Sequence, residues 1–327
     1  MERIKVSVIV PLYNEEKYIE QFLTSLSLQT YPLEHMEWIL VDGNSADKTV
    51  DVIQTFIREK KFPIVLLDNP KRKTPYALNL AIGHARGDYI IRLDAHASYY
   101  SDYIEKCVYY LDTTDADNVG GVAETSANGT VGHAISKMLS TKFGVGGSDF
   151  RVGEGDKYVD TVPFGAFRRR EVFDKVGLFN PKLLRSEDND MNARIRQNGG
   201  KIWLANDIRF KYYCRDTVKG ILKMGLQNGN ALFRTLFVNP KAMSLRHFIP
   251  FAFLMSLICM PIFSLVFPIF WWVFAAEMSA YILLDFYFSF VSVKPVKCGF
   301  VTIWLYPLFH IAYGLGSLLG LFSIALY

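Results

Sequence analysis

Apolar runs alternate with amphipathic stretches through the first hundred residues. The apolar runs are VSVIVPLY, EWILVDG, PIVLLD and DYIIRLDA, and the helical patterns between them cover residues 15–29, 46–60 and 74–86. This alternation is typical of βαβ units, whose right-handed crossovers build a parallel sheet. We therefore predict an α/β fold with a Rossmann-like, mainly parallel sheet.

Polar residues follow each of these four predicted strands. They are Tyr13, Asn14 and Glu15; Asp42, Gly43 and Asn44; Asp68 and Asn69; and Asp94 and His96. A single residue of this kind, such as Asn14, is more often a turn or helix cap. Because all four strands end in this way, we predict a binding crevice at their carboxyl ends, where open α/β sheets hold ligands.

The fourth strand runs into IIRLDAHASYY, which puts a carboxylate and an imidazole two positions apart. Side chains two apart on a strand point the same way, so Asp94 and His96 are predicted to project together. The first turn, PLYNEE, contains no glycine. A nicotinamide-binding enzyme would need glycines there to approach a pyrophosphate, so the sequence disfavours that class.

Charged residues become rare in the last quarter of the chain. The apolar run 248–293 is interrupted by Glu277 and Asp285, and a second apolar run follows the basic turn KPVK. Runs of this length predict transmembrane helices rather than the alternative, a buried helical hairpin in a soluble protein. The predicted helices lie near residues 248–267, 270–292 and 300–325.

The flanking charges give these helices an orientation. The basic residues at their ends are Lys241, Arg246, Lys294 and Lys297. Under the positive-inside rule they lie in the cytosol, and three spans then leave the C-terminus outside. No secretory signal precedes the first strand. We expect a multi-pass protein of the cell membrane, with a cytosolic catalytic domain at 1–215, an amphipathic interfacial segment at 216–247 and a membrane domain at 248–327.

Composition excludes two further classes. The net charge of +4 is modest, and the basic residues beside the membrane account for it better than nucleic-acid binding does. The four cysteines are scattered and form no CxxC pair. They suit a reducing cytosol and suggest neither a disulfide framework nor a zinc site.

Four ordered motifs resemble the family 2 glycosyltransferases, which have the GT-A nucleotide-diphospho-sugar transferase fold. They are VSVIVPLYNEEKYIEQFLTSLSLQTYP, ILVDGNSADKT, ARGDYIIRLDAHA and SEDNDMNARIRQNGG, and the similarity covers roughly residues 5–235. Within the family, the chain looks most like bacterial membrane-bound enzymes that extend lipid-linked oligosaccharides for exopolysaccharide or capsule. The resemblance implies an inverting transfer from a UDP-sugar to a polyprenyl-diphosphate-linked oligosaccharide.

The resemblance assigns the fourth-strand motif to a metal. The family carries an Asp-x-Asp motif here, and this chain has Asp94-Ala95-His96. The resemblance implies that Asp94 and His96 bind a divalent cation, Mn²⁺ or Mg²⁺, that bridges the nucleotide's diphosphate. An imidazole in place of the second acid shifts the preference toward Mn²⁺. In the alternative, His96 only hydrogen-bonds the neighbouring loop.

The resemblance also implies a nucleoside pocket. Asp42 matches the acid that holds the uracil base, although it could instead cap the following helix. Lys73 lies in the basic loop KRK, which either neutralises phosphate charge or is a solvated turn. The implied nucleotide-sugar-binding set is Pro11, Tyr13, Glu15, Asp42, Lys73 and Asp94.

A third acidic cluster, EDND, opens a predicted helix at residues 187–190. Acids at a helix N-terminus are favoured by the helix dipole, but three in four positions exceed what a cap needs. The resemblance implies that Asp188 is the general base that takes the proton from an acceptor hydroxyl. It places Phe164, Gly165 and Glu187 on the acceptor and donor-sugar side.

Two features of the sequence argue against a processive synthase that secretes its own polymer. Processive relatives carry Gln-x-x-Arg-Trp where this chain reads QNGNA at 227–231, and three spans leave no channel for a polymer. The alternatives to a single-sugar transferase are a polyprenyl-monophosphate sugar synthase and a non-catalytic scaffold of a polysaccharide assembly complex. Gly316 and Gly320 also fit a helix-packing GxxxG pattern.

Overall fold

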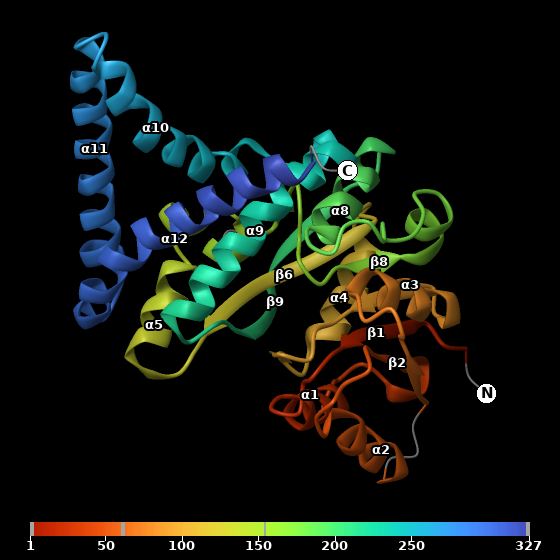
Figure 1. The fold of residues 1–327 in the computed structure, drawn as a ribbon. Helices are drawn as coiled ribbons and strands as arrows, with labels where there is room; N and C mark the ends of the chain where they lie inside the picture. The colour runs from red at the N-terminus through yellow and green to blue at the C-terminus, as the bar shows by residue number, and fades with distance from the viewer. Residues whose placement is uncertain (1–2, 60–62, 154, 325–327) are drawn as a thin grey trace. The chain divides into compact units, whose positions relative to one another are not determined.

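The structure is a computed structural model that describes residues 3–59, 63–153 and 155–324 (Figure 1). The chain divides into two compact units. The first comprises residues 1–124 and 153–212, and the second comprises residues 125–152 and 213–327. The first unit ends at residue 212, and segment 125–152 groups with the C-terminal helices in the second unit. The predicted division into a catalytic domain (1–215), an interfacial segment (216–247) and a membrane domain (248–327) stays a prediction.

The first unit is built on a sheet of nine strands within the described residues, in the order β3-β2-β1-β4-β8-β6-β9-β5, with β7 paired to β9. The strands are β1 (Val6–Leu12), β2 (Met36–Asp42), β3 (Ile64–Asp68), β4 (Tyr89–Arg92), β5 (Ala97–Tyr99), β6 (Asn118–Ser126), β7 (Lys157–Tyr158), β8 (Ala166–Arg168) and β9 (Ile202–Tyr213). The helical segments are α1 (Ile19–Ser27), η1 (Leu33–His35), α2 (Thr49–Glu59), α3 (Thr74–His84), α4 (Tyr103–Thr113), η2 (Arg170–Asp174) and α8 (Glu187–Gln197).

The predicted parallel sheet is confirmed for β1 to β4, which pair in parallel. β4 with β8, β6 with β8, and β9 with β5 and β7 pair antiparallel, so the sheet as a whole is mixed. β1 and β2 are buried almost throughout because helices cover both faces, and their sequences are therefore continuous apolar runs. Helix α1 buries one stripe, Ile19, Phe22, Leu23 and Leu26, at helical spacing.

The second unit is helical apart from the ends of β6 and β9. Its segments are α5 (Gly129–Met138), α6 (Lys142–Val145), α7 (Asp149–Val152), α9 (Val218–Val238), η3 (Pro240–Ala242), η4 (Leu245–His247), α10 (Ile249–Ser264), α11 (Ile269–Tyr287), η5 (Phe288–Ser292) and α12 (Val296–Ile324). Each of the three predicted membrane segments contains a helix, and the last residue of the third, 325, lies outside the described residues. In Figure 1, α9 and α12 lie side by side, and α10 and α11 form a hairpin.

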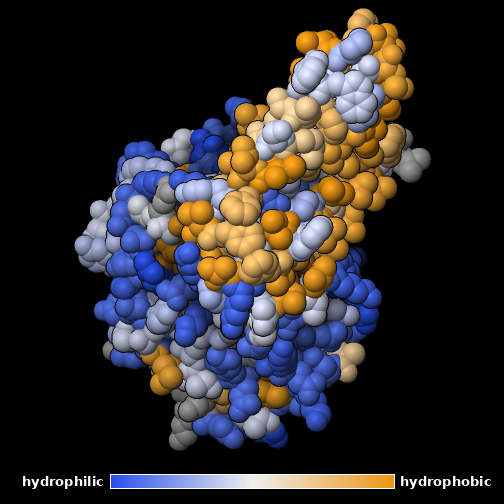
Figure 2. Space-filling view, turned by 90° about the vertical axis from the view of Figure 1, so that its left-hand side faces the viewer, coloured by the Kyte–Doolittle hydropathy of each residue, from blue (hydrophilic) through white to orange (hydrophobic). Residues whose placement is uncertain are grey.

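Two stretches among the described residues are long and apolar enough to cross a membrane, residues 269–292 and 296–323. Helix α10 has 16 residues, fewer than the roughly 20 that a span needs. Hydrophobic side chains form a continuous zone over these helices (Figure 2), and Leu265, Trp272 and Leu283 are each at least 70% exposed. The second unit thus has the surface of a membrane-associated protein, while the number of spans stays a prediction.

The two acids of α11 have neutral partners in the second unit. The Ser256 hydroxyl donates to Glu277 Oε1 at 2.6 Å, and the Ser289 hydroxyl donates to Asp285 Oδ1 at 3.1 Å. Acids in an apolar helix are expensive unless they bond to protein groups. These two hydrogen bonds explain how Glu277 and Asp285 are accommodated in an apolar helix, and no bound ligand is needed for that explanation.

Helices α9 and α12 touch backbone to backbone through glycines. A Cβ added to Gly229 would lie 2.0 Å from the Tyr313 carbonyl oxygen, and one added to Gly316 would lie 2.1 Å from the Leu226 carbonyl oxygen. Glycine at such positions lets two helices approach closely. The predicted role of Gly316 in helix packing is therefore confirmed, and its partner is α9.

Replacing Gly229 with alanine should destabilise the second unit. The methyl group would overlap a helix carbonyl that cannot move aside, and overpacking of this kind costs about 1–3 kcal/mol. We expect Gly229→Ala to lower the thermal midpoint of the detergent-solubilised protein by several degrees. Gly83→Ala is the matched control, because a Cβ on this exposed helical glycine of α3 meets nothing within 4 Å. Equal midpoints for the two variants would contradict the prediction.

Candidate functional site

The turns after β1 and β2 are fastened together by hydrogen bonds. The backbone N–H of Asn14 donates to Ser45 Oγ at 2.9 Å, and Ser45 Oγ donates to Asp42 Oδ1 at 2.6 Å. In return, the backbone N–H of Ala46 donates to Asn14 Oδ1 at 2.9 Å. Asn14 adopts a left-handed backbone, which asparagine tolerates better than most residues. The first two predicted strand ends therefore form one edge of the site.

Asp42 is 4% exposed and ends β2. Its other carboxylate oxygen, Oδ2, accepts a bond from the backbone N–H of Ser45 at 2.9 Å. Both oxygens therefore already serve the turn; they bond Ser45 and do not cap the following helix α2, which begins at Thr49. Contact with a nucleoside base stays a prediction for Asp42, as it does for Pro11, Tyr13, Glu15 and Lys73. Tyr13 is half exposed and Lys73 is exposed, so both side chains can be reached by a ligand.

Asp94 and His96 come together, but not in the way the sequence suggested. The strand ends at Arg92, and residues 93–96 form a turn before β5, so period-two alternation does not apply. The turn nevertheless brings His96 Nε2 to 3.8 Å from Asp94 Oδ2. His96 Nδ1 lies 3.4 Å from Glu15 Oε1, and Tyr212 packs against the ring edge-on. These contacts link the ends of β1 and β4.

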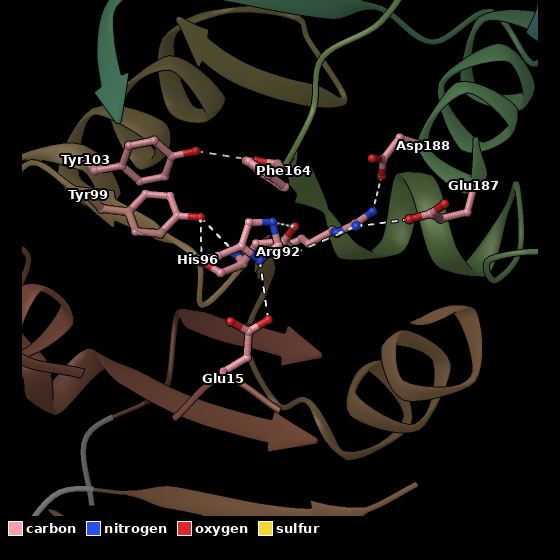
Figure 3. A network of polar contacts seen from close by, with 9 residues as sticks. Glu15, Arg92, His96, Tyr99, Tyr103, Phe164, Glu187 and Asp188 are labelled. Carbon is pink, nitrogen blue, oxygen red and sulfur yellow. Dashed lines mark hydrogen bonds and ion pairs between the residues drawn. The ribbon is translucent and has the colours of Figure 1, made fainter. Parts of the chain in front are cut away.

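Arg92 is the residue that sequence reasoning missed. It is buried at the end of β4, and its guanidinium extends toward α8 (Figure 3). One terminal nitrogen pairs with Asp188, and the other lies 3.0 Å from Glu187 Oε1 and 3.8 Å from Asp94 Oδ1. The rings of Phe164 and Phe179 lie about 6 Å from the guanidinium carbon. Arg92 thus joins the predicted metal motif to the predicted base.

Three carboxylates around one arginine change the protonation of the site. Burial raises the pKa of Asp188 to about 7, with Glu187 and Asp94 adding to the rise and Arg92 opposing it. Burial alone would lower the pKa of Arg92, but Asp188, Glu187 and Asp94 raise it, so the guanidinium stays charged. A carboxylate with a pKa near neutrality can exchange a proton with a hydroxyl at working pH, as a general base must.

This shift predicts the pH dependence of activity. A base acts in its unprotonated form, and a raised pKa means that Asp188 is increasingly protonated as the pH falls through about 7. We expect kcat/KM to fall on the acid side of neutrality rather than near pH 4, where an ordinary aspartate titrates. Initial rates from pH 5 to 9 would measure the profile. The residual rate of Asp188→Asn should not fall in this way on the acid side of neutrality. If the fall is unchanged in the variant, it is caused by the titration of another group.

Phe164 and Gly165 lie beside Arg92. The Gly165 carbonyl accepts a hydrogen bond from the Arg92 backbone N–H at 3.0 Å, and a Cβ on Gly165 would lie 2.2 Å from Asn118 Oδ1. Phe164 has a left-handed backbone with φ 48°, and so does Ser186, the residue before α8, with φ 61°. Non-glycine residues in this region are strained, and such strain concentrates at functional sites. Close packing thus explains Gly165, while a sugar contact for it stays a prediction.

The residues present can supply part of a metal site. Among the described residues, no three or more His, Cys, Asp or Glu side chains gather as a metal-binding group. Asp94 Oδ2 and His96 Nε2 offer one oxygen and one nitrogen donor on the same side of the turn. Such a pair fits a cation whose remaining ligands come from phosphate oxygens and water. When bound, the cation would offset negative charge on a departing diphosphate.

Known proteins provide a comparison for this arrangement. A curated relative from Methanococcus voltae, named dolichyl N-acetyl-alpha-D-glucosaminyl phosphate 3-beta-D-2,3-diacetamido-2,3-dideoxy-beta-D-glucuronosyltransferase, is 29% identical over 80% of this chain and 82% of its own length. Succinoglycan biosynthesis protein ExoA of Rhizobium meliloti is 31% identical over 64% of this chain and 63% of its own.

Similarity in structure extends over nearly the whole chain. A mannosyltransferase of Pyrobaculum calidifontis, solved in complex with GDP-Man and Mn²⁺, aligns with 97% of this chain and 88% of its own, with a TM-score of 0.66 and 19% identity. That likeness confirms the predicted GT-A fold. The sequence model for glycosyl transferase family 2 matches residues 7–177, which carry the first turns, the Asp94 motif and Gly165. By fold and by sequence, the chain is a glycosyltransferase and belongs to glycosyl transferase family 2.

Proposed function

We propose that this protein transfers one sugar, with inversion, from a UDP-sugar to a polyprenyl-diphosphate-linked oligosaccharide in exopolysaccharide or capsule synthesis. The observation that carries the transfer is the Arg92 cluster, which holds Asp188 within the same network as Asp94. A base and a partial cation site are the two groups that inverting transfer requires on either side of the sugar.

Two relatives support the acceptor class. The Methanococcus voltae relative is named for a dolichyl-linked sugar phosphate, and the Rhizobium meliloti relative is named for succinoglycan biosynthesis. The apolar helices α10 to α12 supply what a lipid-linked acceptor demands, an enzyme held at the membrane. A UDP donor is supported by one structure of the Staphylococcus aureus protein TarS, which holds UDP-GlcNAc and has a TM-score of 0.53 and 16% identity.

The mechanism uses this chain's own groups. Asp188 would accept the proton of the acceptor hydroxyl as that oxygen attacks the anomeric carbon. Arg92 would fix the orientation of Asp188, because its guanidinium bonds both Asp188 and Glu187, and its charge would oppose the rise in the pKa of Asp188. Asp94 and His96 would hold the divalent cation, and the turn residues Tyr13 and Asp42 would contact the nucleoside.

The direct test is release of UDP by the purified full-length protein. A panel of UDP-sugars would be supplied with and without lipid-linked glycans extracted from a producing strain. Acceptor-stimulated release with one donor supports the proposal and identifies the sugar. Transfer to a polyprenyl monophosphate, which has no hydroxyl proton to remove, would favour the synthase alternative. Nucleotide binding without release from any donor would favour the scaffold alternative.

Metal preference gives a further prediction. Replacing His96 with aspartate would restore the Asp-x-Asp pattern and exchange a nitrogen donor for oxygen, which suits Mg²⁺. We expect His96→Asp to bind Mn²⁺ less tightly relative to Mg²⁺, and we expect EDTA to abolish turnover in both proteins. Loss of the free Mn²⁺ electron paramagnetic resonance signal, recorded with UDP present, would measure binding. If the ratio of the Mn²⁺ affinity to the Mg²⁺ affinity is the same in the two proteins, His96 is not a ligand of the cation.

A further inference from the structure

The helices α9 and α12 form a pair whose two outer faces differ. They run parallel, because the contacts advance together along both: Gly225 meets Phe309, Gly229 meets Tyr313, and Gly320 meets Asn230. At the far end, the Arg234 guanidinium donates to Ser323 Oγ at 3.2 Å. The contact therefore extends along most of α9 and along the second half of α12.

The outer face of α9 is polar. Its inner stripe is Ile221, Gly225, Gly229 and Leu232, all buried. The residues on the opposite side include Lys219, Lys223 and Gln227, all exposed. At 100° per residue, the second set lies diametrically across the helix from the first. This polar face covers the first half of α9, and the exposed Phe237 follows on the same side near the end of the helix.

The outer face of α12 is apolar. Its members are Phe300, Trp304, Leu308, Leu315, Leu319 and Phe322, each at least 41% exposed. They follow one another at spacings of three, four and seven, so they share one face. The opposite face packs on α9 and, nearer its start, on Ala134, Ile135 and Met138 of α5. Half of the most apolar 18-residue stretch within residues 296–323 is buried inside the protein, whereas only 6% of the corresponding stretch within residues 269–292 is buried.

This arrangement conflicts with α12 as a span. If α12 crossed the bilayer, Lys223 of α9 would enter it beside the middle of α12, because Gly225 of α9 meets Phe309. A lysine or arginine at the bilayer centre is costly, and such residues almost always face protein or a water-filled cavity. The exposed residues of α5, such as His133 and Lys137, would face lipid beside the first half. A helix lying flat at the interface avoids both costs, since water covers one side and lipid the other.

We propose that α12 lies along the membrane surface, with its apolar stripe in the acyl chains of the nearer leaflet and with α5 and α9 between it and water. Only the hairpin of α10 and α11 enters the bilayer deeply. Lys294 and Lys297, both exposed just before or at the start of α12, lie at the level of anionic headgroups. The end of α12 then lies on the catalytic side of the membrane, in place of the outside position expected for three spans.

Depth measurements on the full-length protein test this proposal. Single nitroxide labels would be placed at residues 300, 308, 315 and 322 in a variant with the four cysteines replaced by alanine, reconstituted in nanodiscs. Relative accessibility to oxygen and to a water-soluble nickel chelate reports depth. A flat α12 gives four similar depths, about 5–10 Å below the headgroups. A spanning α12 places its ends about 33 Å apart, so residues 308 and 315 would be far deeper than residues 300 and 322.

Labels elsewhere in the second unit serve as controls. Ala280 of α11 should lie deeper than every α12 label, and Lys223 of α9 should be open to the nickel chelate. A deep Lys223 label, or a depth profile of α12 with a central maximum, would overturn the proposal. The inference rests on the membrane association in the proposed function, and flotation of the protein with liposomes tests that association separately. Failure to float would refute both, whereas flotation with a spanning α12 would refute only the flat orientation.

Discussion

Asp188→Asn is expected to reduce kcat by about 10²–10⁴-fold, the contribution typical of a positioned general base. The amide has nearly the same shape and can still bond Arg92, but it cannot accept a proton. Donor binding and the thermal midpoint should therefore change little. Single-turnover rates with a saturating acceptor measure the effect on chemistry apart from product release.

Asp190→Asn is the matched control for this result. Asp190 belongs to the same acidic run, but its carboxylate accepts from Arg194 Nε at 3.0 Å, within helix α8. Its loss should weaken the helix and leave kcat within about threefold of wild type, since removing an interaction outside the transition state spares the chemical step. If the two variants lose equal activity, the effect belongs to the helix rather than to a base.

Arg92→Met is expected to reduce both stability and turnover. The methionine removes the cation that three carboxylates face, and breaking a buried ion pair from one side costs about 3–5 kcal/mol. For a unit of this size, that loss lowers the thermal midpoint by roughly 6–20 °C, which tryptophan fluorescence during heating would measure. Asp188 also loses its orienting partner, so kcat should fall at least tenfold, on the order of one mispositioned catalytic group.

Two further variants separate charge from geometry at this site. Arg92→Lys keeps the charge but not the fork that reaches Asp188 and Glu187 together, so its stability and kcat should lie between those of wild type and Arg92→Met. Arg209→Ala breaks the exposed pair with Glu124 and should change stability by less than about 1 kcal/mol. If Arg92→Met has the same thermal midpoint as the wild type, the Arg92 cluster does not stabilise the fold.

The sequence predicted the order of elements well because the periodicity is strong. The parallel strands, the start of α8 at Glu187 and the three C-terminal helices lie close to their predicted positions. The helix predicted from residue 15 begins at Ile19, because Asn14 and Glu15 turn to meet the β2 end. Local patterns show apolar faces, whereas hydrogen bonds between distant turns have no local signal.

Arg92 was missed for the same physical reason. A single arginine in an apolar strand looks like a surface position, and its partners lie about a hundred residues further along the chain. A cation flanked by buried residues on both sides was the available signal, since an unpaired charge is almost never fully buried. The grouping of residues 125–152 with the C-terminal helices was equally invisible, because α5 packs on a helix that begins at residue 296.

The charges around Arg92 also affect the order in which ligands can arrive. Glu15, Asp94, Glu187 and Asp188 bring four carboxylates close to a single guanidinium and one imidazole. The site is therefore anionic before anything binds, so under the proposed function a bare nucleotide diphosphate would approach against a repulsive field. A diphosphate already paired with a divalent ion has lost most of that repulsion. Under the proposed function the ion–nucleotide complex would be the favoured arriving species, and the local concentration of the free ion would set how readily the site fills.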